Sequence, residues 1–190
     1  MAKVRDWQGL KEMSARLLLE RTGEDVAAWN QRIQREGFHN EASLRAWLSQ
    51  QGVTGYAQSL LVMEQFGYPD FLLATADDLI EGQYADRPQL RPIFEAIVAA
   101  AAALGEITIQ ARKTYVSLVT PRRTFARVQP TTRQRVDLAL RLAGQKPGGR
   151  LLPSKIHESM PLQISLTTPE EVDAEVIRWL QQAYQENRGG

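Results

Sequence analysis

The chain has 190 residues, of which 43% are apolar and 24% charged, and its formal net charge is +1 at pH 7. This composition is ordinary for a globular protein, and the length suffices for one generous domain or two small ones. The lack of cysteine excludes disulfides and thiolate metal sites, and two histidines are too few for a histidine-rich metal centre. The sequence has no apolar run near the roughly 18 residues of a membrane span and no signal-peptide core, so we expect a cytoplasmic protein without a membrane partner.

The small net charge hides a segregation of charge along the chain. Residues 1–80 hold eight basic and eleven acidic side chains, whereas residues 105–160 hold eleven basic and three acidic ones. The two stretches therefore carry net charges of −3 and +8. Such an asymmetry informs about partners rather than fold, and it favours an anionic partner for the second stretch.

The first 66 residues predict four short helices. Apolar residues recur near helical spacing in each segment, and glycines follow three of them. Trp7, Trp29 and Trp47 all lie in this part of the chain and indicate a compact bundle with aromatic packing. We therefore expect a helical domain at residues 1–70.

A second domain is expected at residues 82–186. Its first helix, at 88–104, begins after Asp86 with a proline, and its second helix, at 169–185, follows the cap residue Thr168. Segments with strand character lie between the two helices. The pattern predicts an antiparallel sheet that is packed on one face by these helices, so the predicted fold class is α+β.

The clearest alternation lies between Arg112 and Leu142, which predicts three consecutive strands separated by turns that contain proline. Alternation places aliphatic side chains on one face and most basic ones on the other. Strict alternation also assigns Phe125 to the basic face, beside Arg123 and Arg127. The predicted anion-binding residues are Arg112, Lys113, Tyr115, Arg123, Phe125, Arg127, Arg135 and Arg141.

Two interpretations of this basic face remain open. Arginines interleaved with aromatic rings are typical of surfaces that bind single-stranded nucleic acid or another anionic, phosphate-bearing ligand. Arginines also cover sheets with their aliphatic stems while their charged ends stay in water, and the acidic helical domain could pack over the face and neutralise it. A β-bulge near Phe125 would turn its ring to the opposite face.

No other pattern predicts catalysis, a cofactor or a metal site. The acidic pairs Asp77-Asp78 and Glu170-Glu171 lie at predicted helix starts, where carboxylates stabilise the helix dipole. Ser117 and Ser159 have no histidine in a recognisable relationship, so nucleophilic catalysis lacks support, and His157 is expected in a solvated loop. We therefore favour a non-enzymatic binding or interaction protein.

Two alternatives come from other functional classes. A small-molecule or enzymatic site could lie in a cleft between the two domains, lined by Tyr84 and Tyr115. The N-terminal helices could instead form a protein–protein adaptor, which exposed tryptophan side chains would indicate.

Several stretches carry a family resemblance. They are TGEDVAAW and LRAWLSQQGVTGYAQ in the first part, and YADRPQLRPIFEAI, ARKTYVSL, RRTFARVQPTTRQRVDLALRL and EVDAEVIRWLQQAY in the second. Through them the chain resembles a bacterial two-domain family of unknown function, in which a helical module precedes a domain loosely labelled "predicted transport protein". The resemblance implies no catalytic or binding residues, and the placement of His157 before Met160 departs from the family pattern.

Overall fold

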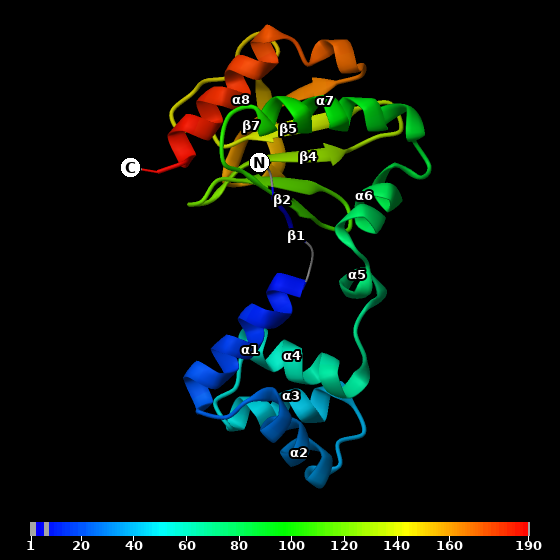
Figure 1. Ribbon diagram of the computed structural model, residues 1–190, viewed down its shortest axis with the longest axis vertical. Coiled ribbons are helices and arrows are strands. Elements are labelled where there is room, and N and C mark those ends of the chain that lie inside the picture. The colour runs from blue at the N-terminus through cyan, green and yellow to red at the C-terminus, as the bar shows by residue number, and fades with distance from the viewer. Residues whose placement is uncertain (1–2, 6–7, 190) are drawn as a thin grey trace. The chain divides into compact units, whose positions relative to one another are not determined.

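The computed structural model describes residues 3–5 and 8–189, and these residues form the predicted α+β fold (Figure 1). They divide into two compact units, each with a core of its own. One unit contains the helices up to α5, and the other contains β1 and every element from α6 onward. No helix in the described ranges combines the length and the apolar character that a membrane crossing requires.

The first unit consists of helices whose apolar side chains face one another. They are α1 (Gln8–Thr22), α2 (Val26–Glu36), α3 (Glu41–Gln50), α4 (Gly55–Phe66) and the short α5 (Asp70–Leu73). Trp29 and Trp47 meet edge to face, with ring centroids 6.0 Å apart, in a core that also contains Ile33 and Leu48. Aromatic packing therefore contributes to this core, as the tryptophan content predicts.

The second unit contains a seven-stranded sheet with the order β1-β2-β3-β4-β5-β7-β6. The strands are β1 (Lys3–Arg5), β2 (Thr108–Ala111), β3 (Val116–Val119), β4 (Thr124–Pro130), β5 (Val136–Leu140), β6 (Leu152–His157) and β7 (Met160–Leu166). The strands β2 to β7 pair antiparallel, as predicted, and β1 joins β2 in parallel. The sequence pattern predicts neither β1 nor β6. The edge strand β6 is mostly exposed and contains Pro153, so it shows little apolar alternation.

One face of this sheet is aliphatic and is covered by helices. The helices of the unit are α6 (Ala76–Tyr84), α7 (Arg91–Ala102) and α8 (Ala174–Asn187). The register aligns Leu118, Ala126, Leu140 and Leu162 across four strands, and all four side chains are buried. α8 packs on β4 and β5, and α7 packs beside α8 (Figure 1). Helices therefore cover one face, as predicted, and they leave the polar side chains on the other.

Candidate functional site

The second face of the sheet carries a row of polar side chains. The strand register aligns Gln110, Ser117, Arg127, Ala139 and Gln163 across β2, β3, β4, β5 and β7. The next row contains Gln129 and Asp137. We call these seven residues the polar face; Ser117, Asp137 and Ala139 are buried in it, and the other four are half-buried. Arg127 is central, because the small side chains of Ser117 and Ala139 lie on either side of it.

Arg127 stacks on Tyr115 at the centre of the polar face. The guanidinium carbon lies 3.9 Å from the centroid of the tyrosine ring, and both side chains are half-buried. Within the described part of the chain, no carboxylate forms an ion pair with Arg127, and its Nε has no hydrogen-bond partner. The stack therefore holds a positive charge in a fixed orientation without neutralising it.

Helix α6 holds the turn that carries Tyr115. Gln83 is only 5% exposed, and its Nε2 donates to the backbone oxygens of Arg112 at 2.7 Å and of Tyr115 at 3.1 Å. The Arg112 guanidinium donates to Gln110 Oε1 at 2.9 Å, and Lys113 is exposed in the same turn. One buried amide therefore positions the part of the chain that contains three of the predicted binding residues.

Arg135 forms an ion pair with a buried carboxylate. Its Nε lies 3.0 Å from Oδ1 of Asp137, which is 1% exposed and also accepts a hydrogen bond from Ser165 Oγ at 2.6 Å. The Arg135–Asp137 contact is an ion pair without the alignment of a hydrogen bond. A buried carboxylate requires such partners, and Asp137 therefore already balances the charge of Arg135.

Phe125 does not lie on the polar face, and its assignment there was wrong. The pairing of β4 with β3 shifts between Ala126 and Thr124, so that Phe125 has no partner residue in β3. This β-bulge turns the ring to the aliphatic side, where it is fully buried. It meets Tyr184 of α8 edge to face, with centroids 5.5 Å apart. Strict alternation fails at this point because the bulge adds one residue to β4.

Arg123 and Arg141 belong to a separate group. They line a pocket of about 280 Å³ at the end of the β4–β5 hairpin that lies opposite its turn, together with Ser159 and Asn187. The eight predicted residues are therefore not one site. Four of them gather around the Arg127–Tyr115 stack and its turn, two line the pocket, Arg135 is paired with Asp137, and Phe125 is in the core.

The structure also relates Ser159 to a histidine, which the sequence analysis did not predict. Ser159 Oγ lies 2.8 Å from Nδ1 of His157, at the end of β6. The backbone N–H of Ser159 donates to the same Nδ1 at 3.2 Å, and Arg141 donates to Ser159 Oγ at 2.8 Å. The hydroxyl is therefore engaged in the structure of the β6–β7 turn.

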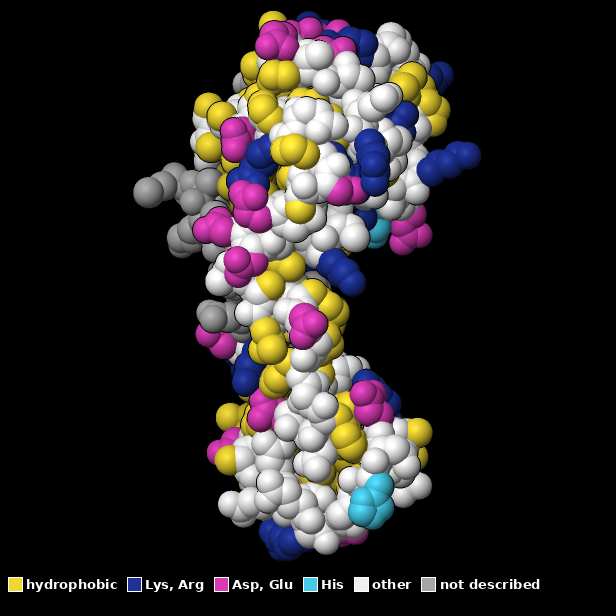
Figure 2. All heavy atoms as spheres, turned by 90° about the vertical axis from the view of Figure 1, so that its right-hand side faces the viewer, with side chains coloured by type: hydrophobic (Ala, Val, Ile, Leu, Met, Phe, Trp, Pro, Cys, Tyr) yellow, Lys and Arg dark blue, Asp and Glu magenta, His cyan; other side chains and the backbone are white. Residues whose placement is uncertain are grey.

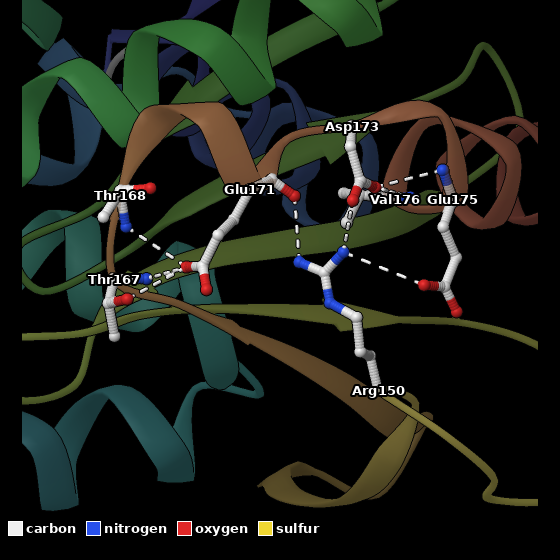
Figure 3. A network of polar contacts seen from close by, with 7 residues as sticks. All are labelled: Arg150, Thr167, Thr168, Glu171, Asp173, Glu175 and Val176. Carbon is white, nitrogen blue, oxygen red and sulfur yellow. Dashed lines mark hydrogen bonds and ion pairs between the residues drawn. The ribbon is translucent and has the colours of Figure 1, made fainter.

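Arg150 is neutralised at the start of α8 (Figure 3). It contacts Asp173 at 2.7 Å and Glu175 at 3.8 Å, and it donates to the backbone oxygen of Glu171 at 2.9 Å. Asp173 also caps α8, and Glu171 accepts backbone hydrogen bonds from Thr167 and Thr168. These backbone hydrogen bonds lower the pKa of both carboxyl groups. The acidic cluster thus serves helix capping, as the sequence analysis expected.

The basic side chains on the face that Figure 2 presents lie among acidic ones. Figure 2 shows Lys and Arg side chains interspersed with Asp and Glu over the second unit. Arg133, for example, lies 4.0 Å from Asp86. Among the described residues, no three His, Asp or Glu side chains are grouped in a way that could hold a metal ion. The surplus positive charge of residues 105–160 is therefore divided into small groups.

The side chains named in the two alternatives lie mainly in cores. Tyr84 is 2% exposed and packs on Phe94, with ring centroids 5.5 Å apart, and burial raises its pKa. Trp29 is buried and Trp47 is half-buried, whereas Trp7 lies outside the described residues. Neither Trp29 nor Trp47 offers the exposed ring that the adaptor hypothesis requires.

Comparison with protein-family models matches residues 77–187 to DUF5655, a domain of unknown function. The chain belongs to this family. The DUF5655 match begins in α6 and ends at the last residue of α8, so it contains the polar face, the pocket and the helices that support them. No curated protein and no solved structure matches the chain. A fold alone does not define a function, so the side chains of the polar face and of the pocket carry the information about what this domain binds.

Proposed function

We propose that the DUF5655 domain binds single-stranded nucleic acid on its polar face. The observation that carries this proposal is the Arg127–Tyr115 stack, in which the guanidinium carbon lies 3.9 Å from the ring centroid and no carboxylate neutralises the charge within the described chain. A cation beside an aromatic ring offers a phosphate contact and a stacking platform at the same place.

The neighbours of the stack suit such a ligand. Three glutamine side chains, Gln110, Gln129 and Gln163, lie around Arg127 in the register, and an amide group can both donate to and accept from base edges. The acidic residue of the polar face is Asp137, which is buried and paired with Arg135. A phosphate that approaches Arg127 therefore meets no exposed carboxylate among the seven residues of this face.

The proposed role is binding rather than catalysis. The stack and the glutamines provide contacts but no general base or activated nucleophile. The Ser159–His157 contact belongs to a turn, and among the residues that the structure describes no further side chain orients the imidazole as a base. A cytoplasmic location and the absence of a cofactor are part of the same proposal.

Fluorescence anisotropy with a labelled oligothymidine strand tests this function on the full chain. Binding should weaken steeply between about 50 and 200 mM salt, because bound phosphates release counterions. Arg127→Ala should reduce the magnitude of the slope of log K against log salt by about 0.7, which is the value for one contact to a single strand. Tyr115→Leu should lower affinity about 5- to 150-fold by removing a stacked base contact.

Arg133→Ala is the matched control. It also removes one positive charge from the second unit, but Arg133 lies in the β4–β5 turn and its side chain is 80% exposed beside Asp86. The salt slope of this variant should stay near that of the unchanged protein. The proposal is wrong if the strand does not bind at 50 mM salt, if binding is insensitive to salt, or if both arginine variants lose affinity equally.

A further inference from the structure

The pocket beside Arg123 and Arg141 differs in shape from the polar face. Its volume of about 280 Å³ is close to the lower end of the range for small-molecule sites. The two arginines and Ser159 contribute polar groups, while the exposed Pro161 contributes apolar surface. A concave site with convergent polar groups and an apolar wall suits a small ligand better than a polymer.

The guanidinium of Arg141 is held in place by uncharged acceptors. Its Nε donates to the backbone oxygen of Thr124 at 2.8 Å, and its Nη2 donates to Ser159 Oγ at 2.8 Å. Neither acceptor carries a negative charge. In the described part of the chain, no carboxylate forms an ion pair with Arg141 or Arg123. Both arginines thus bring positive charge to the pocket without a neutralising partner.

Buried polar groups at the end of α8 fix the backbone of both arginines. Asn187 is 1% exposed, and its Nδ2 donates to the backbone oxygen of Arg141 at 2.9 Å. Its own backbone oxygen accepts from Thr120 Oγ1 at 2.8 Å, and this hydroxyl also accepts from the backbone N–H of Arg123 at 3.1 Å. Arg123 precedes β4 and Arg141 follows β5, and the buried residues Asn187 and Thr120 tie their backbones together. The site is therefore pre-organised.

The electrostatics of the pocket favour an anion. Burial lowers the pKa of Arg141, and the nearby charge of Arg123 lowers it further. Glu186 also lines the pocket, where its carboxylate accepts hydrogen bonds from the Ala143 amide at 3.0 Å and from Gln182 at 2.9 Å and keeps its charge, so the lining holds two positive side chains and one negative one. Two like charges that face one hollow repel each other, and an anion between them relieves this repulsion.

We propose that this pocket binds a small phosphate monoester, whose phosphate contacts Arg123 and Arg141 and whose organic part lies along Pro161. Ser159 is a positioning residue, because it holds the Arg141 guanidinium. This site is independent of nucleic-acid binding on the polar face, since its arginines are not those of the Arg127–Tyr115 stack.

Titration of the full chain with phenyl phosphate, followed by nuclear magnetic resonance and calorimetry, tests the proposal. Saturable binding should shift the backbone amide signals of Ala143, Gly144 and Ser159, which line the pocket. Arg123→Gln should weaken binding about tenfold or more, because it removes a charge-assisted hydrogen bond. Arg123 is exposed at its turn, and no side chain among the described residues forms a hydrogen bond or ion pair with its guanidinium, so this variant should fold.

Arg122→Gln is the matched control, since Arg122 is the exposed neighbour of Arg123 but does not line the pocket. It should change affinity less than twofold, and Arg127→Ala should leave phenyl phosphate binding unchanged even if it abolishes nucleic-acid binding. Equal losses in Arg122→Gln and Arg123→Gln overturn the proposal. Absence of saturable binding, equal binding of phenol, or shifts confined to the polar face also overturn it.

Discussion

Replacement of Phe125 by alanine tests the β-bulge that decides which side chains reach the polar face. The ring is 0% exposed and meets Tyr184 edge to face at 5.5 Å between centroids. Truncation of a buried phenylalanine costs about 3–5 kcal/mol through lost transfer free energy and a residual cavity. Roughly 0.5–1.5 kcal/mol of this belongs to the aromatic pair. If the ring were on the exposed face, as strict alternation predicts, the change would stay within about 0.5 kcal/mol.

Native-state hydrogen exchange of the β4 and β5 amides measures this cost in the second unit, separately from the helices of the first. Phe125→Ala should lower the free energy of unfolding by about 3–5 kcal/mol. Phe125→Leu keeps an apolar side chain in the core and should cost clearly less. Tyr115→Ala is the control from the same sheet, since it removes a half-buried ring and a cation–π contact of about 0.5–2 kcal/mol. Equal costs below 1 kcal/mol for Phe125→Ala and Tyr115→Ala, well under the estimated range, would refute both the bulge and the assignment of faces.

Three further substitutions test other contacts of the domain. Gly105→Ala should lower the melting temperature of the second unit, because Gly105 has φ = +146° and an added Cβ would lie 2.5 Å from the hydroxyl of Tyr184. The double variant with Tyr184→Phe lacks this hydroxyl, so its melting temperature should be partly restored. Glu171→Gln should cost about 1 kcal/mol at pH 7. The Thr167 amide is the main cause of the lowered folded-state pKa of Glu171. The stabilisation is therefore present above the unfolded pKa of about 4.3 and is lost as the pH falls through the folded pKa. The denaturation curves of Glu171→Gln and the unchanged protein should converge at that low pH. Gln83→Leu should lower stability by about 1–3 kcal/mol in urea unfolding, because two backbone oxygens lose their donor; a neutral result would show that α6 does not hold the β2–β3 turn.

The alternation of the central strands predicts the aliphatic face correctly because side-chain direction repeats every two residues, which is a property of the local chain. The position of Phe125 could not be predicted in the same way. The bulge depends on how β4 pairs with β3, and pairing is a property of two strands rather than one. Strand β6 was missed for a related reason, since an exposed edge strand has no buried face to impose a pattern.

The charge count predicts a basic region but not which of its charges are already paired. Arg150 is balanced by Asp173, 23 residues away in the sequence, and Arg135 by a carboxylate in the middle of a strand. The first pair cannot be recognised in the sequence, because its partners are near only in space, whereas Arg135 and Asp137 are two residues apart and only the burial of Asp137 is hidden. Arg123, Arg127 and Arg141, which form no ion pair with a carboxylate among the described residues, therefore became distinguishable only once the strands were placed.

Gln83 and Asn187 show how the two candidate sites are built by the same physical device. Each is a buried amide near the end of a helix, and each donates from its nitrogen to backbone oxygens of a segment that carries candidate ligand-binding residues. Each also leaves its own side-chain oxygen without a hydrogen-bond partner among the described residues. An unsatisfied buried oxygen costs about 1–3 kcal/mol, so each amide holds its backbone partners at some cost in stability. The two amides therefore fix the backbone at Tyr115 and at Arg141, and the lost hydrogen bonds of their own oxygens are the cost of this fixed geometry.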